Sequence, residues 1–194
     1  MATERRSRTR VLERGDIFFL FRPNVEEFAP EGLLDIRRFY MVLHPEGDER
    51  FRLIAIGKKK LPGSEEGGQR NWGFVDGMFR NPEELRQAAG GLRASMESRG
   101  ENIRPAGEGV YAIVLHGNHT HLAYVLELPL IPGEVQQAFN ITPEGRFVLA
   151  IKNPEATSPP GVGLESDRQA DFPQELRARF AERRWVPVDP PEFL

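Results

Sequence analysis

A chain of 194 residues and 22.0 kDa has room for one large domain or two small ones, and a domain of this length buries about 70% of the surface that its unfolded chain exposes. Charged residues make up 28% and hydrophobic residues 39% of the composition, and no apolar run reaches the roughly 18 residues that a membrane-spanning helix requires. These features argue against a disordered chain and against a membrane protein. Because the chain has no cysteine, disulfide scaffolds, zinc ribbons, iron–sulfur sites and thiol nucleophiles are excluded.

The amino-terminal segment differs in charge from the rest of the chain. Residues 1–14 contain five arginines and two glutamates, whereas the whole chain has a net charge of −3. The segment also lacks the apolar stretch of a secretory signal, so we expect a cytoplasmic protein without a membrane partner. We predict a flexible basic arm at residues 1–12 and a single compact domain at residues 13–194, with halves at about 13–100 and 106–194.

The first half is typical of strands joined by turns. Three segments rich in aromatic and β-branched residues, separated by proline and glycine, span residues 16–22, 38–44 and 52–56. Their apolar runs are nearly continuous, which predicts strands covered on both faces. Residues 71–77 predict a further buried strand that ends at a turn.

A helix is predicted after Asn81, which can cap it, with Pro82 in its first turn. Apolar side chains then recur on one helical face, at Leu85, Ala88, Ala89, Leu92 and Met96. Glycines at positions 90 and 91 each weaken a helix by roughly 1 kcal/mol relative to alanine, so a short or broken helix is also compatible with the sequence.

The carboxy-terminal part begins with a long surface loop, predicted from the proline, glycine and serine residues after position 152. A second helix follows, because Phe172, Leu176 and Phe180 repeat with helical spacing. The final segment contains too many prolines for a central strand, which predicts an edge strand or an extended tail.

The second half repeats the order of strands, at residues 110–116, 121–128 and 147–152. Motifs in the two halves align with offsets of 94, 84 and 95 residues, as a diverged duplication of a three-stranded unit would produce. Two unrelated meanders give a similar alignment, so both interpretations stay open. We predict an α+β fold, predominantly β, with two antiparallel meander-like sheets or barrel halves and two peripheral helices.

Three of the four histidines lie close together in the sequence, at His116, His119 and His121. Gly117 and Asn118 lie between two predicted strands and favour a two-residue hairpin, which would place all three histidines on one face. Cβ atoms on that face are roughly 5–8 Å apart, a range from which imidazoles converge on zinc or another divalent metal. A metal-dependent hydrolase is therefore one candidate function. The alternative is an exposed polar hairpin tip, since a three-residue loop would distribute the histidines over both faces.

The lysines cluster after the third predicted strand, at Lys58, Lys59 and Lys60. One interpretation is a solvated turn that protects an edge strand from pairing. The other is a phosphate-binding face, and hence a nucleic-acid-binding module, in which the lysines join the arginines of the arm. Those arginines are Arg5, Arg6, Arg8 and Arg10.

Several segments carry a resemblance to known families. ERGDIFFLFRP, WGFVDG, GEGVYAIVLHGNHTHLAYVLELP and WVPVDPPEFL together resemble a bacterial protein family of unknown function, over nearly the whole chain. The GD before a strand and the later NWGFVD are also similar to PUA-like barrels of the EVE and YTH kind. The latter resemblance implies a barrel that binds modified nucleobases.

Motifs of common catalytic sites do not occur in the sequence: there is no GxxxxGK[ST], HExxH or GxSxG. Acidic pairs are adjacent in sequence, so their side chains diverge and cannot share a substrate. The catalytic residues, if any, stay unassigned. The sequence favours a non-catalytic binding or interaction protein with no evident cofactor, for a protein or small-molecule ligand.

Overall fold

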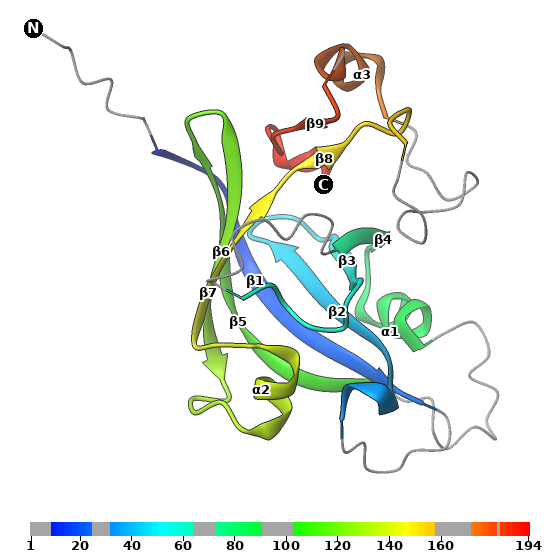
Figure 1. Ribbon diagram of the computed structural model, residues 1–194, viewed down its shortest axis with the longest axis vertical. Helices are drawn as coiled ribbons and strands as arrows, with labels where there is room; N and C mark the ends of the chain where they lie inside the picture. Colours follow the sequence, from blue (N-terminus) through cyan, green and yellow to red (C-terminus); the bar gives the residue numbers. More distant parts are fainter. Residues whose placement is uncertain (1–8, 25–31, 64–72, 91–102, 158–171, 182) are drawn as a thin grey trace, which may run out of the picture.

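The computed structural model describes residues 9–24, 32–63, 73–90, 103–157, 172–181 and 183–194 (Figure 1). Its strands are β1 (Thr9–Pro23), β2 (Ile36–Pro45), β3 (Phe51–Ile56), β4 (Gly73–Phe79), β5 (Arg104–His116), β6 (His119–Leu128), β7 (Glu144–Leu149), β8 (Ile151–Lys152) and β9 (Trp185–Val186). Its α-helices are α1 (Pro82–Gly90), α2 (Glu134–Phe139) and α3 (Gln174–Phe180), and its 3-10 helices are η1 (Leu33–Asp35) and η3 (Pro191–Phe193). No helix in these segments is long and apolar enough to cross a membrane.

Seven strands form one curved antiparallel sheet in the order β4-β3-β2-β1-β5-β6-β7, and β8 pairs with β9 in a small second sheet. The prediction of a β-rich α+β fold is confirmed. The two meanders do not form separate sheets, because β1 and β5 pair along most of their length and join them into one. The large sheet ends at β4 and β7 and is not closed into a barrel.

The concave face of the sheet holds the larger core. Phe39 stacks on Phe139 of α2 with ring centroids 4.4 Å apart, and Phe19 meets Tyr124 edge to face at 5.2 Å. The buried Gln136 of α2 donates a hydrogen bond of 2.7 Å to the carbonyl of Ala106. Aromatic packing and this bond attach α2 to the sheet, since six residues alone do not form a stable helix.

The outer face of the sheet is covered by α1 over β2 and β3, where Leu85 and Ala89 pack against Tyr40, Val42 and Leu53. The predicted cap of α1 is confirmed, because Oδ1 of Asn81 accepts a hydrogen bond of 2.8 Å from the backbone amide of Glu84. The predicted continuation to Leu92 and Met96 lies outside the described residues.

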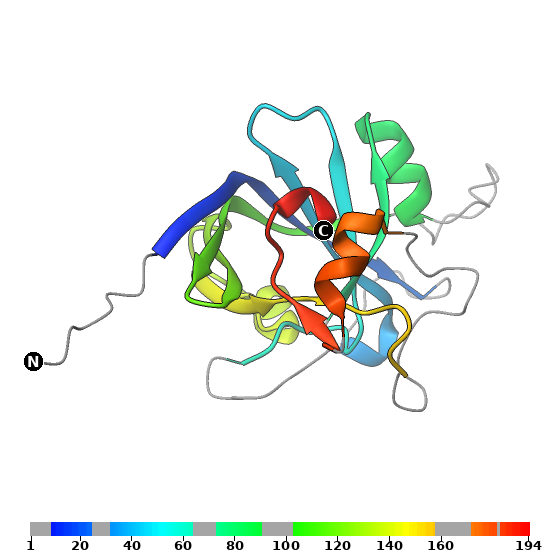
Figure 2. The same ribbon diagram turned by 90° about the horizontal axis from the view of Figure 1, so that it is seen from above.

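The carboxy-terminal segment lies over one open end of the curved sheet (Figure 2). Thr120, fully buried in β6, fixes it in place: its hydroxyl donates to the carbonyl of Leu149 at 2.7 Å and accepts from the backbone amide of Val188 at 3.0 Å. Val186, Val188 and Phe180 complete the concave core.

Several predicted boundaries need correction. Residues 9–12, predicted to belong to the flexible arm, are part of β1, where Val11 pairs with Val114 of β5. The predicted strand at residues 147–152 is divided between β7 and β8, which belong to different sheets. α2 is a helix that the sequence did not predict, so the described chain has three α-helices where two were predicted. The rest of the arm, residues 1–8, lies outside the described residues.

Apart from the edge strand β4, which has no counterpart, the strand order is symmetric about the β1–β5 pair, with β2 and β3 on one side and β6 and β7 on the other. Asp16 pairs with Val110, and these two positions are separated by the 94 residues of the first predicted offset. The second offset is different: equivalent glycines of β1 and β5 pair with Pro45 and Leu126, which are 81 residues apart rather than 84. Duplication of a three-stranded unit stays a prediction.

Candidate functional site

The β5–β6 hairpin has the geometry predicted for the histidines. His116 pairs with His119 across a two-residue turn, and Gly117 at its start has a φ of +64° that favours glycine. His121 pairs with Val114 as predicted. The three histidines therefore share the outer face of the sheet.

The imidazole rings pack edge to face, with centroids 5.5 Å apart for His116 and His119 and 4.7 Å apart for His119 and His121. Burial, followed by the positive charges of its neighbours, lowers the pKa of His121. Within the described ranges, no group of three or more histidine or acidic side chains is arranged to hold a metal ion. The structure thus places the histidines together but does not show the predicted metal geometry.

The predicted basic face is not assembled from its described members. Lys58, Lys59 and Lys60 follow β3, and the ammonium of Lys59 donates to the carbonyl of Ile36 at the start of β2. Arg10 lies near the opposite end of β1, where its guanidinium donates to a carboxylate oxygen of Asp189 at 2.9 Å. Arg5, Arg6 and Arg8 lie outside the described residues. Lys59 and Arg10 therefore contact different parts of the molecule.

A polar groove of about 820 Å³ lies between the start of β1, the β2–β3 turn and the carboxy-terminal η3 helix. Its lining includes Glu13 of β1, Arg52 of β3 and Glu192 of η3, with Glu46 and Asp48 from the turn. The groove thus brings together residues from the two ends of the chain.

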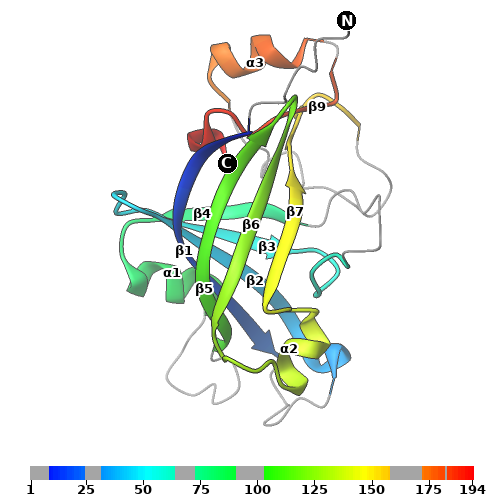
Figure 3. The ribbon, with the colours of Figure 1, turned by 90° about the vertical axis from the view of Figure 1, so that its left-hand side faces the viewer.

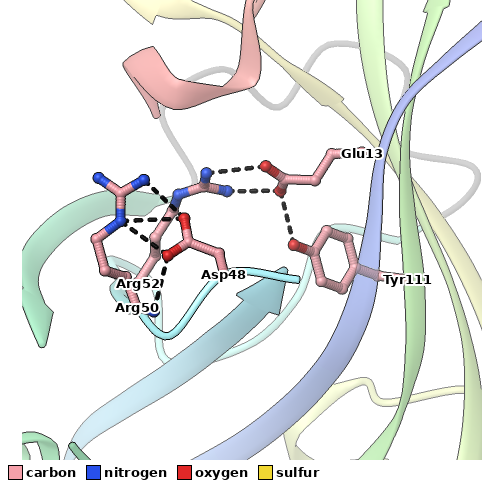
Figure 4. Close-up of polar contacts among 5 residues, drawn as sticks. All are labelled: Glu13, Asp48, Arg50, Arg52 and Tyr111. Atoms are coloured by element: carbon pink, nitrogen blue, oxygen red, sulfur yellow. Dashed lines mark hydrogen bonds and ion pairs between the residues drawn. The ribbon is translucent and has the colours of Figure 1, made fainter. Parts of the chain in front are cut away.

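Glu13, Arg52 and Tyr111 form a buried cluster beside the groove (Figure 4). The two terminal nitrogens of Arg52 donate to the two carboxylate oxygens of Glu13, at 2.5 and 2.8 Å. The hydroxyl of Tyr111 donates to Oε1 of Glu13 at 2.6 Å. The side chains of Arg52 and Glu13 are only 3% and 11% exposed, so this bidentate ion pair is largely removed from water.

Burial and the neighbouring charges shift the pKa values of Tyr111 and Arg52. Burial, the hydrogen bond to Glu13 and its negative charge raise the pKa of Tyr111. For Arg52, burial lowers the pKa, but the hydrogen bonds and charge of Glu13 outweigh it and the net pKa is raised. Tyr111 therefore stays a hydroxyl donor and Arg52 a cation at neutral pH. The carboxylate of Glu13 thus accepts three hydrogen bonds within the cluster.

The β2–β3 turn carries a second ion pair at the groove (Figure 4). Asp48 accepts hydrogen bonds from Nε of Arg50 at 2.9 Å and from Nη2 at 2.7 Å. The side-chain hydrogen bond from Arg50 lowers the pKa of Asp48 to about 2. Arg50 and Arg52 are thus both paired with carboxylates of the chain itself.

The sequence contained a signal for this cluster. Arg52 interrupts the apolar segment of β3, and a charge in a strand covered on both faces requires a buried partner. The partner could not be identified from the sequence, because Glu13 is 39 residues away from Arg52 and 98 residues away from Tyr111.

Comparisons of the chain with protein-family models, with curated protein sequences and with solved structures find no match.

Proposed function

We propose that this protein is a non-catalytic binding domain and that the polar groove binds its ligand. The observation that carries the proposal is the buried Glu13–Arg52–Tyr111 cluster beside an open groove of about 820 Å³. A buried ion pair contributes little net stability compared with apolar packing, whereas a rigid and preorganised set of polar groups favours binding. Ligand pockets of 300–1,000 Å³ are typical of small-molecule sites.

The charges of the lining indicate the chemistry of the ligand. Four carboxylates and three guanidiniums line the groove, and Arg50 and Arg52 are neutralised by Asp48 and Glu13. In the part of the chain that the structure describes, Glu46 and Glu192 form no ion pair. The third guanidinium, that of Arg14, forms no ion pair there either, so two carboxylates and one guanidinium remain unpaired. This excess of negative charge favours a ligand with an amine, a guanidinium or several N–H donors.

Calorimetric titration tests the proposal with L-arginine, spermidine, adenosine and cytidine as donor-bearing probes, and with acetate and phosphate as anionic controls. The two nucleosides also test the resemblance to PUA-like barrels. We expect at least one donor-bearing probe to bind, and Glu192→Gln and Glu46→Gln each to weaken binding about tenfold, because a hydrogen bond to a charged group contributes about 1.5–3 kcal/mol. The matched control is Glu83→Gln on α1, whose carboxylate is exposed and outside the groove.

Binding of the anions alone would overturn the proposal, as would equal affinity of the wild type and the Glu192→Gln variant. If no probe binds, the groove is not a site for cationic or donor-rich small molecules. The two other candidate functions have tests of their own. Stoichiometric zinc that is lost in His119→Ala would support the hydrolase, and oligonucleotide binding that weakens steeply with salt would support the nucleic-acid module.

We also infer a duplicated three-stranded unit. The symmetric strand order and the pairing of positions 94 residues apart support it. The buried ion pair joins β1 and β3, in the first of the two units. A feature that is present in one unit of a duplicated fold is a candidate for a functional rather than a structural role.

A further inference from the structure

The outer face of β5, β6 and β7 carries apolar side chains that are open to solvent. α1 covers a different part of the same outer face, over β2 and β3. Figure 3 looks onto the strands β5, β6 and β7. Val110, Val125 and Val148 are 42%, 53% and 55% exposed. Val110 and Val125 pair with each other across β5 and β6, and exposed apolar side chains that adjoin on a sheet face mark an interaction surface.

The strand registers arrange this face in rows that run across four strands. One row has arginine at each end and alanine between them: Arg14, Ala112, Ala123 and Arg146. The row beside it has carboxylates at its ends and valine between them: Asp16, Val110, Val125 and Glu144. Positive ends thus lie next to negative ends, and small side chains lie next to large ones.

We propose that two copies of this chain pack face to face through these rows, related by a two-fold axis that runs parallel to the rows and between them. This rotation places each row of one copy over the other row of the second copy. Arg146 then meets Glu144, and Arg14 meets Asp16. Ala123 meets Val125, so a small side chain lies opposite a large one and the two faces interdigitate.

Charge excludes the other simple arrangement. A two-fold axis parallel to the strands would place Arg14 over Arg146 and Asp16 over Glu144, and like charges in contact are unfavourable. Among the described residues, Arg14, Arg146 and Glu144 form no ion pair within the chain. The charges of these three residues are therefore available to a second copy, whereas the carboxylate of Asp16 also lies 3.7 Å from Nδ1 of His44.

The size of the face predicts a weak dimer. Four strands about 4.8 Å apart, each contributing about 20 Å of length, cover roughly 400 Å² per copy. Stable interfaces bury about 800 Å² per partner. We therefore expect association in the micromolar range at low ionic strength, weakened by salt.

Sedimentation velocity of the full chain from 5 to 500 µM in 50 mM salt tests the proposal. We expect a concentration-dependent dimer. Arg146→Glu and Glu144→Arg should each raise the dissociation constant at least tenfold, because each puts like charges in contact at two places per dimer. The double variant Glu144→Arg/Arg146→Glu restores opposite charges across the axis and should dimerise again. Arg86→Glu on α1 is the matched control and should dimerise like the wild type.

The double variant has the same net charge as the wild type. If it dimerises, the effect of the single variants comes from the charges at this interface and not from misfolding or from a change in net charge. A monomer at every concentration, or a double variant that stays monomeric, would overturn the proposal. A dimer that persists in Val125→Asp would also overturn it, because pairing through the edge strand β7 does not require Val125. None of these variants alters a residue that lines the groove.

Discussion

Replacing Arg52 by methionine tests whether the ion pair beside the groove is buried and coupled. Methionine retains much of the apolar stem but removes both donors to Glu13, whose side chain is 11% exposed. Tyr111 is then the remaining donor to that carboxylate among the contacts of the cluster. Removing one partner of a buried pair costs about 3–5 kcal/mol, a large share of the 5–15 kcal/mol that stabilises a typical domain.

Urea unfolding of Arg52→Met, followed by circular dichroism at pH 7, measures this cost. We expect the free energy of unfolding to fall by about 3–5 kcal/mol with little change in the slope against urea. The triple variant Glu13→Leu/Arg52→Met/Tyr111→Phe removes all the polar groups together, and we expect it to unfold within about 1 kcal/mol of the wild type.

The control is Arg50→Met, which breaks the exposed pair with Asp48 and should destabilise the protein much less than Arg52→Met. A loss of less than about 1 kcal/mol in Arg52→Met would equal that of a surface ion pair. That result would refute the conclusion that the Glu13–Arg52 pair is shielded from water.

Three further predictions concern single residues. Gly109→Ala should lower the free energy of unfolding in urea by about 3 kcal/mol, because the added Cβ would lie 2.0 Å from the carbonyl oxygen of Val125. The control Gly32→Ala, where a Cβ would meet no atom within 4 Å, should be nearly neutral. Equal losses of stability in the two variants would contradict the tight strand pairing at Gly109. Burial lowers the pKa of His121 below 6.5, so as the pH falls the unfolded chain binds the proton of this histidine before the folded chain does. The free energy of unfolding should therefore decrease as the pH drops below 6.5. If His121→Asn shows the same dependence of unfolding free energy on pH as the wild type, the prediction is wrong. The pKa of Asp48 falls from 3.8 to about 2, so its contribution should be complete above pH 3.8 and lost as the pH falls through about 2, and the stability difference from Asp48→Asn should follow that course.

The strands were predictable because their signal is local. Aromatic and β-branched residues define β1, β2, β3, β5 and β6, and Asn81 defines the start of α1. The histidine hairpin was predictable for the same reason, since a two-residue turn fixes the register of the strands that it joins. α2 was missed because Phe139 and Gln136 hold it through contacts with distant strands rather than through helix propensity.

The groove was not predictable because its members come together only in the folded chain. Glu13 lies in a segment that was predicted to adjoin a flexible arm, and Glu192 lies near the other end of the sequence. The two meanders were predicted as two sheets or two barrel halves, because no local signal shows that β1 and β5 pair. That pairing places Tyr111 beside Glu13, and it therefore creates the cluster.

The positions of Glu13 and Arg52 can be compared with the equivalent positions in the other half of the sheet. On the opposite side of the sheet, the strand registers place Gly107 at the position equivalent to Glu13 and Gly145 at the position equivalent to Arg52. The space beside Gly145 is filled by the ring of Tyr124, because a Cβ there would lie 2.3 Å from that ring. The same strand pairing thus forms on that side with glycine at both positions, and we predict that it also forms on the other side when the ion pair is replaced by apolar side chains. The triple apolar variant should therefore fold and yet bind the donor-bearing ligand at least tenfold more weakly in calorimetry; a variant that folds and binds as the wild type would show that the cluster has no part in recognition.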